Sequence, residues 1–211
     1  MIYSVKDIKK DLKELSEKQF YTKHIIRSDN WYFEKYLEKT PDEVIHLIDD
    51  YRLIVSESFG VSFNSVMMVG SGKLGFSISP PDIEHPEKTK MFLPFNDDEN
   101  VRKISDLDIA IISSDIFHEY WKMFRNSYRA RFQNTYIHLY KELYRGYINE
   151  RNIMQVDVCR RRWNQIALQS KKKLKSDLYF KHEISYRIYR NWEDFEDYNI
   201  QNIRKIKKEV Y

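Results

Sequence analysis

The sequence predicts an α+β fold in which helices pack on a small mixed β-sheet. Short apolar runs of strand length occur at Ser65–Val69, Asp106–Ile112 and Ile153–Val158. Longer stretches with apolar residues at helical spacing lie before and between these runs, and residues from Trp163 to Tyr211 are mainly helical in pattern. This order of few strands and several helices favours one sheet with helices packed on it.

Two helices are predicted before the first strand. Ser4 is placed to cap a helix that runs to about Phe20, with apolar positions at helical spacing. The second begins with Thr40-Pro41-Asp42-Glu43, which has the pattern of a capping box with proline at the first helical position. Apolar residues continue on one side of it as far as Ile54.

The remaining elements alternate between sheet and helix. After the first strand, the segment Phe76–Asn100 holds four of the five prolines and many charges, which predicts a long loop or insertion. After the second strand, Asp115 starts a helix that reaches Phe124, and a further helical stretch covers Asn134–Tyr147. The third strand and the helical end follow.

Length and composition indicate one globular domain. The chain has 211 residues, and we expect N-terminal helices over 1–39, a core over about 40–160 and a C-terminal helical segment over 161–211. The sequence contains neither a run of about 18 apolar residues nor a signal-like apolar N-terminus, so we expect a cytoplasmic protein without a membrane span. The single cysteine, Cys159, cannot form an intramolecular disulfide.

Positive charge is concentrated in the last quarter of the chain. The formal net charge is +4, and basic runs occur at Arg160–Arg162, Lys171–Lys175 and Arg204–Lys208. Such runs attract phosphate-bearing ligands when they lie near a catalytic site. Solvated helix faces are the other interpretation of each run taken alone.

Three aspartates form the strongest chemical signal. Side chains alternate along a strand, so Asp106 and Asp108 point the same way while Leu107 and Ile109 point into the core. Asp157 adds a carboxylate from the third predicted strand. Carboxylates held together favour hard divalent cations, and three of them can hold two Mg²⁺ ions, or Mn²⁺ in their place. The expected chemistry is phosphoryl or nucleotidyl transfer.

A glycine-rich turn follows the first strand. Gly70–Gly75 supplies small residues where backbone N–H groups and the Ser71 hydroxyl can approach phosphate oxygens, and Lys73 is a further candidate for phosphate contact. The segment is not a Walker A loop, because that motif needs glycine at Met67 and serine or threonine at Leu74. An ordinary glycine turn with a surface lysine is the alternative.

Together, Val69–Ser71 (VGS), Ser105–Ile111 (SDLDIAI) and Gln155–Val158 (QVDV) resemble the signature of the DNA polymerase β-like nucleotidyltransferase superfamily. That signature is a hydrophobic-Gly-Ser turn, an Asp-hydrophobic-Asp strand and a later single Asp. The resemblance covers roughly Ser65–Cys159, with the three motifs in the family's order.

The resemblance implies roles for individual residues. Asp106, Asp108 and Asp157 would bind the catalytic metal ions, while Gly70 and Ser71 would hold the phosphates of a dNTP or NTP. The sequence departs from the family in one respect, because 35 positions separate Ser71 from Asp106 and the proline-rich insertion fills the difference. This departure leaves the geometry of the nucleotide-entry side open.

The acceptor of the nucleotide is suggested by the end of the chain. Residues 193–211 read as a basic helix that stops at Tyr211, whose phenol could attack an α-phosphate. The whole resembles the HalB family, the nucleotidyltransferases of Hailong anti-phage systems. The resemblance implies synthesis of single-stranded DNA oligomers from dATP, primed on the terminal tyrosine, with the DNA repressing a partner effector protein.

Other acceptors and activities stay open at this stage. A toxin–antitoxin nucleotidyltransferase that modifies protein or tRNA would use the same aspartates without Tyr211, and a cyclic or oligonucleotide second-messenger synthase would release small products. A catalytically inactive nucleotide-binding module is a fourth reading, and assembly into a homo-oligomer is also open. The six histidines have no metal-ligand spacing, so we expect them on the surface or in the core.

Overall fold

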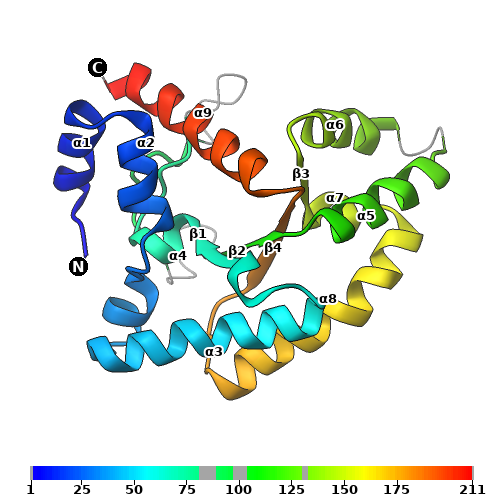
Figure 1. Cartoon of the computed structure of the whole chain (residues 1–211), viewed down its shortest axis with the longest axis horizontal. Helices are drawn as coiled ribbons and strands as arrows, with labels where there is room; N and C mark the ends of the chain where they lie inside the picture. The colour runs from blue at the N-terminus through cyan, green and yellow to red at the C-terminus, as the bar shows by residue number, and fades with distance from the viewer. Residues whose placement is uncertain (1, 81–88, 97–103, 130–132, 211) are drawn as a thin grey trace. The chain divides into compact units, whose positions relative to one another are not determined.

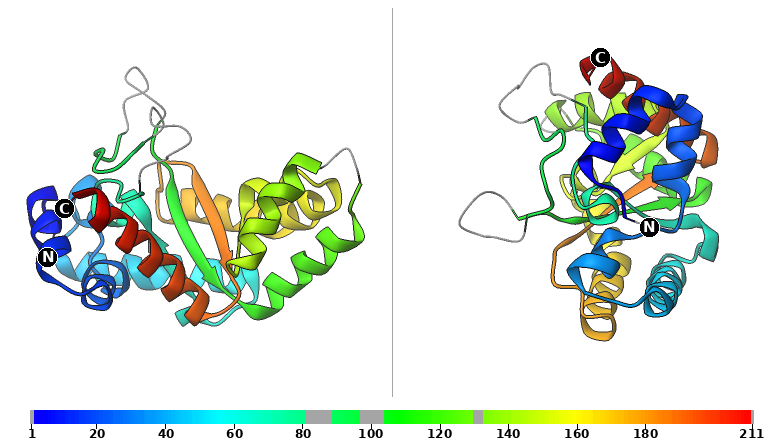
Figure 2. Two further views of the ribbon diagram at one scale, coloured as in Figure 1. Left: turned by 90° about the horizontal axis from the view of Figure 1, so that it is seen from above. Right: turned by 90° about the vertical axis from the view of Figure 1, so that its left-hand side faces the viewer.

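The strands form one four-stranded β-sheet in the order β1-β2-β4-β3 (Figures 1 and 2). The computed structural model describes residues 2–80, 89–96, 104–129 and 133–210. Within these residues the strands are β1 (Val66–Val69), β2 (Leu107–Ile112), β3 (Tyr147–Asn149) and β4 (Ile184–Tyr189). β3 pairs antiparallel with β4, with Ile148 opposite Ile188. The predicted α+β class and small sheet are confirmed.

The strands form where apolar and β-branched residues are concentrated. In β2, Leu107, Ile109, Ala110 and Ile111 are completely buried, so the strand has apolar neighbours on both faces. In β4, buried residues alternate with partly exposed ones, which gives the strand one covered and one open face. β2 is therefore covered on both faces; it contains the candidate carboxylate Asp108 and directly follows Asp106.

The chain divides into two compact units. The first contains Met1–Ile48, Met68–Asp108 and Glu196–Tyr211, and the second contains Asp49–Met67 and Ile109–Phe195. Among the described residues, none of the helices combines the length and apolar character needed to cross a bilayer.

In the first unit, helices from the two ends of the chain lie near one another (Figure 1). The helices of this unit are α1 (Val5–Glu14), α2 (Glu17–Phe20), η1 (Tyr21–Ile26), η2 (Tyr32–Tyr36), α4 (Gly70–Leu74) and the later part of α9 (Trp192–Val210). Lys207 of α9 donates a 2.6 Å hydrogen bond to the carbonyl of Leu15, and Lys18 lies 2.7 Å from the carboxylate of Glu196. These bonds hold α9 against the N-terminal helices.

The predicted helix from Ser4 to Phe20 is two helices. Ser4 caps α1 as expected, but α1 ends at Glu14 and Leu15 is extended. Ser16 then forms a second capping box with Gln19 and starts α2. Because the Ser16 side chain can accept a hydrogen bond from the first turn of a new helix, the chain has an alternative to one continuous helix. This alternative explains the break.

The second unit contains several helices besides β3 and β4. They are α5 (Ser114–Asn126), α6 (Gln133–Tyr144), α7 (Glu150–Ile153) and α8 (Asp157–Asp177), together with the later part of α3 (Pro41–Phe59) and the short η3 (Phe63–Ser65). Ser113, rather than Asp115, caps α5. Trp163 of α8 is 1% exposed and packs against Phe59 and Tyr120. The same helix buries Cys159, and burial raises the pKa of its thiol to about 12.

The predicted third strand at Ile153–Val158 is wrong. Ile153 ends α7, residues 154–156 form a turn, and Asp157 is the first residue of α8. The sheet instead takes β4 from a segment that was predicted to be mainly helical, and β3 begins at Tyr147, where the predicted helix Asn134–Tyr147 ends. The helix pattern of the residues after Asp157 therefore outweighs the short apolar run before it.

The predicted loop Phe76–Asn100 lies partly outside the described residues. In the parts that are described, 76–80 and 89–96, there is no helix or strand, as predicted. An isolated antiparallel bridge joins Phe76 to Pro94, and the amide of Phe95 donates to the carbonyl of Gly75 at 2.8 Å. The start and the later part of this loop are thus tied together.

The capping box at the start of α3 leads to a prediction about stability and pH. The Glu43 carboxylate accepts hydrogen bonds of 2.9 Å from the amide and the hydroxyl of Thr40, and the Thr40 hydroxyl accepts from the Glu43 amide. These bonds, with Lys39 nearby, lower the pKa of Glu43 to about 2. We expect Thr40→Ala to lower the free energy of unfolding at pH 7 by about 1 kcal/mol.

The pH dependence of this difference follows from the sign of the shift. Because the pKa of Glu43 is lower in the folded protein than its usual 4.5, its contribution is present above that pH and is lost as the pH falls towards 2. Urea unfolding of both proteins between pH 2 and 7 should show the difference narrowing over this window. A difference that stays constant over this window would contradict the role assigned to Glu43.

Candidate active site

The candidate site begins where β1 ends. The apolar strand Val66–Val69 leads directly into α4, whose first residue is Gly70. Gly70 has a φ of 69°, in the left-handed region that glycine adopts without strain. Ser71 follows it and is half-buried. The predicted glycine turn is therefore a sharp strand-to-helix turn.

The paired aspartates lie at the start of β2. Asp106 is the residue directly before the strand, and Asp108 is its second residue. Both are half-buried, whereas Leu107 between them is completely buried. At the start of this strand burial therefore alternates from residue to residue, which places both carboxylates on the face opposite Leu107.

The turn and Asp108 are in direct contact within the first unit. A Cβ atom added to Gly70 would lie 2.7 Å from Oδ2 of Asp108, and one added to Gly72 would lie 2.7 Å from Cδ2 of Leu107. α4 therefore approaches β2 closely through two residues that lack side chains. The structure brings Gly70 next to Asp108, and Ser71 and Asp106 are close to this contact along the chain.

The contact between Gly70 and Asp108 can be tested with a matched pair of glycines. Gly60 has a φ of 65°, close to that of Gly70, but a Cβ there would meet no described atom within 4 Å. We expect Gly60→Ala and Gly70→Ala each to cost about 1–2 kcal/mol of folding free energy from the left-handed backbone. Only Gly70→Ala should also displace Asp108.

The displacement should reduce the catalytic rate by about 10²-fold in a nucleotidyl-transfer assay, because a misplacement of about 1 Å has effects of this size. The rate is measured for both variants at a temperature where circular dichroism shows them folded. Equal rates for the two variants would show that the contact is irrelevant to activity.

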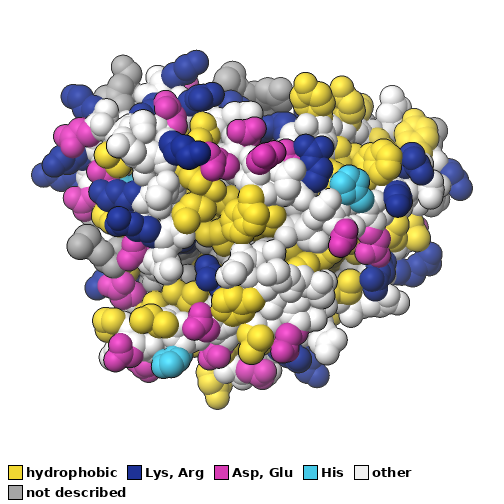
Figure 3. Space-filling model, viewed as in Figure 1, with side chains coloured by type: hydrophobic (Ala, Val, Ile, Leu, Met, Phe, Trp, Pro, Cys, Tyr) yellow, Lys and Arg dark blue, Asp and Glu magenta, His cyan; other side chains and the backbone are white. Residues whose placement is uncertain are grey.

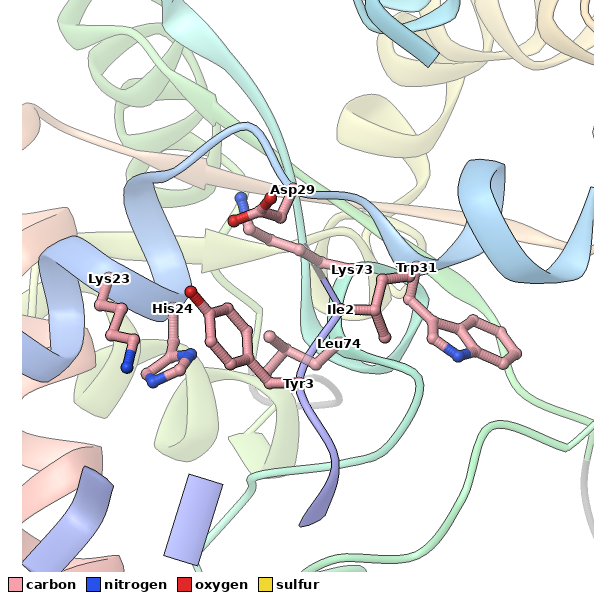
Figure 4. A pocket seen from close by; sticks show the side chains of 8 residues that line it. All are labelled: Ile2, Tyr3, Lys23, His24, Asp29, Trp31, Lys73 and Leu74. Atoms are coloured by element: carbon pink, nitrogen blue, oxygen red, sulfur yellow. The ribbon is translucent and has the colours of Figure 1, made fainter. Parts of the chain in front are cut away.

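Lys73, the predicted phosphate contact, is engaged elsewhere in this structure. It is 8% exposed, and its Nζ donates a hydrogen bond to the backbone carbonyl of Arg27. It lines a small hollow together with Tyr3, Asp29 and Trp31 (Figure 4). To reach a phosphate, the Lys73 side chain would have to leave the Arg27 carbonyl.

The same hollow contains a buried polar group that the sequence pattern does not reveal. Nε2 of His24 lies 2.7 Å from Oδ2 of Asp11, and Lys23 donates to the same oxygen at 2.6 Å. Burial lowers the pKa of His24, although its bond to Asp11 opposes this. His24 is 2% exposed and therefore lies in the core of this unit.

Asp157, the predicted third carboxylate, belongs to the second unit. It is the first residue of α8, and its side chain is 53% exposed. One carboxylate oxygen accepts a 2.7 Å hydrogen bond from Nη2 of Arg160. A carboxylate in the first turn of a helix is favoured by the helix dipole, so this position has a structural explanation as well as a functional one.

Tyr211, the predicted priming residue, lies outside the described residues, and α9 is described as far as Val210. The basic run before it is partly engaged in folding contacts, because Lys207 bonds to the Leu15 carbonyl and lies 3.9 Å from Glu17.

The carboxylates of the candidate site can be compared with the ligands that a divalent cation needs. Asp106 and Asp108 supply carboxylate oxygens, the ligand type that Mg²⁺ and Mn²⁺ prefer. Within the described ranges, no group of three or more His, Cys, Asp or Glu residues is close enough to hold one ion. The aspartate pair thus fits two ligands of such an ion.

The chain matches no protein-family model, no curated protein and no solved structure.

Proposed function

We propose that this chain is a metal-dependent nucleotidyltransferase, which transfers a nucleoside monophosphate from a dNTP or NTP and releases pyrophosphate. The observation that carries the proposal is the contact between Gly70 and the carboxylate of Asp108. It joins a glycine-serine turn, suited to phosphate oxygens, to a half-buried pair of carboxylates in one compact unit. Nucleotidyl transfer needs these two parts to bind the nucleoside triphosphate from which the nucleoside monophosphate is transferred.

Each residue has a defined task in the proposal. The backbone N–H groups at Gly70 and the hydroxyl of Ser71 bind phosphate oxygens of the nucleotide. Asp106 and Asp108 hold Mg²⁺, and Asp157 is the third carboxylate that the superfamily resemblance implies. Bound Mg²⁺ supplies neutralisation of the triphosphate charge and of the leaving pyrophosphate. The acceptor oxygen bonds to the α-phosphorus as the bond to pyrophosphate breaks.

For the acceptor, we propose the phenol of Tyr211, with dATP as the favoured nucleotide. The first transfer would link deoxyadenylate to Tyr211, and each new 3′-hydroxyl would then attack the next dATP. The product is a single-stranded DNA oligomer attached to the protein, which would act on an effector protein in anti-phage defence. This part of the proposal is supported by the sequence resemblance and by the terminal position of Tyr211.

The deciding experiment uses the purified full chain with each α-³²P-labelled dNTP and NTP and with Mg²⁺ or Mn²⁺. Products are resolved on denaturing gels before and after protease treatment. A ladder of deoxyadenylate attached to protein, which disappears when Tyr211 is deleted, supports the primed polymerase. A ladder that survives the deletion rejects the priming role but not the transfer reaction.

The alternatives give different labelled products in the same experiment. A toxin–antitoxin enzyme labels an added protein or tRNA and is indifferent to Tyr211. A second-messenger synthase releases small cyclic or linear oligonucleotides that pass through a filter. Absence of label in every fraction, with all eight nucleotides and both metal ions, would reject the proposed function.

A further inference from the structure

One exposed surface of the second unit is unexplained by the proposed transfer. α6 carries Ile137, Tyr140 and Tyr144 on its outer side, with exposures of 50%, 70% and 82%. Figure 3 shows hydrophobic side chains over α6, with Lys and Arg side chains nearby. We call Ile137, Tyr140 and Tyr144 the α6 face. Large side chains grouped in this way on a surface indicate an interaction site.

The aromatic residues of the α6 face continue a pattern in the sequence. From 120 to 144, every fourth residue is aromatic: Tyr120, Phe124, Tyr128, Phe132, Tyr136, Tyr140 and Tyr144. The first two are buried and belong to the core. The last two are the most exposed of the described members, so packing within the unit does not account for them.

The α6 face is held on a fixed support. On the opposite side of the helix, Leu139 is 1% exposed and Glu142 is 9% exposed. The Glu142 carboxylate accepts hydrogen bonds from the backbone amide and the side-chain amide of Asn149 at the end of β3. Since α6 is anchored on β3, the outer rings are presented without a need for the helix to rearrange.

The two outer tyrosines are arranged as a pair of flat surfaces. Their ring centroids are 6.5 Å apart, and their planes differ by 28°. Because both side chains are largely exposed, the two nearly parallel rings leave aromatic surface accessible one helical turn apart. Every nucleobase has a π-face that stacks on such rings, with about 1–3 kcal/mol per base.

The charge around the α6 face complements a phosphate backbone. Between Tyr120 and Asn149 the sequence has six Lys and Arg residues and one acidic residue, Glu142, which is the buried residue described above. Lys141 lies on the exposed side of α6, and the guanidinium of Arg145 lies over the ring of Tyr147. Exposed aromatic rings combined with nearby cations are typical of surfaces that bind single strands.

We propose that the α6 face binds single-stranded nucleic acid, with bases stacked on Tyr140 and Tyr144 and phosphates near Lys141. Charge favours this occupant over a second copy of the chain, because two copies of a basic surface repel each other. A duplex is a poor ligand since its bases are already stacked. The link to catalysis, in which the bound strand is acceptor or product, rests on the proposed function; the binding itself does not.

The test measures binding without any nucleotide or metal ion. Fluorescence anisotropy of a fluorescein-labelled 20-nucleotide deoxythymidylate is titrated with wild-type protein and with Tyr140→Ala/Tyr144→Ala. We expect the double variant to bind at least about tenfold more weakly, because two stacking contacts are lost. Tyr140→Phe/Tyr144→Phe keeps both rings and should bind within about threefold of wild type.

The matched control is Tyr179→Ala, because Tyr179 lies in the same unit and is 75% exposed. It should leave binding unchanged. Lys141→Gln should reduce the slope of log Kd against log salt concentration by about 1, the amount expected for the loss of one phosphate contact. Asp108→Asn should bind normally, so loss of transfer and loss of binding are distinguishable.

Two results would overturn the proposal. One is equal binding by wild type and the double alanine variant. The other is a wild-type protein that does not bind the oligonucleotide but dimerises in light scattering, with the dimer lost in the double alanine variant. The second result would assign the α6 face to self-association.

Discussion

Asp108→Asn is expected to reduce nucleotidyl transfer by at least about 10³-fold while leaving the fold intact. Asparagine has nearly the shape of aspartate but carries no charge, so it cannot neutralise a divalent cation. Loss of one hydrogen-bond donor to a transition-state charge typically costs 10²–10³-fold in rate, and loss of a metal ligand also weakens the binding of the ion. The rate is measured from pyrophosphate release with saturating Mg²⁺.

A matched control separates this effect from a general loss of negative charge. Asp42, in the first turn of α3, is exposed and remote in sequence from the candidate site. Asp42→Asn should keep the wild-type rate. Both variants should have unchanged circular dichroism, and Mn²⁺ should not rescue Asp108→Asn. Wild-type turnover by Asp108→Asn would remove the basis of the proposed site.

The part of the candidate site that would bind the nucleotide could be predicted from the sequence, because each of its motifs consists of residues close together in the chain. An Asp-Leu-Asp strand start fixes which side chains share a face, and the structure has Asp106 and Asp108 half-buried around buried Leu107. The capping box at Thr40 is likewise confirmed, since it involves residues only three apart. Patterns of this range depend only on local backbone geometry and on side chains a few residues apart.

The error at Ile153–Val158 has a physical cause. A short apolar run is ambiguous between strand and helix, and length with flanking periodicity decides between them. Here the flanking signal favours a helix, because α8 buries Cys159, Trp163, Ala167, Ser170 and Leu174 at spacings of three and four. Asp157 is consequently the start of a helix rather than a strand residue.

The missed strand β4 had a signal in the sequence. Ile184, Tyr186 and Ile188 are buried and alternate with Ser185 and Arg187, which is the period of a half-covered strand. By contrast, the bond between Asp11 and His24 joins residues 13 apart across a helix break. A contact of that kind depends on how the chain returns on itself, which periodicity does not describe.

Glu150→Ala is expected to lower the free energy of unfolding by about 3–5 kcal/mol. The Glu150 carboxylate accepts hydrogen bonds from Nε1 of Trp163 at 2.8 Å, from Nζ of Lys171 at 2.7 Å and from the amide of Tyr186 at 3.0 Å. It thereby joins α7, α8 and β4 within the second unit. Its side chain is only 13% exposed, so removing it leaves three donors, one of them charged, with a lost acceptor in a poorly hydrated place.

The matched control uses a second glutamate that pairs with the same helix. Glu183 lies 2.5 Å from Lys175 of α8, but its side chain is 78% exposed. Because water screens an exposed pair, Glu183→Ala should cost less than about 1 kcal/mol. Urea unfolding followed by tryptophan fluorescence measures both variants. If the two substitutions have equal effects, burial is not what makes the Glu150 carboxylate matter, and the junction of α7, α8 and β4 must be held by apolar packing around Trp163 instead.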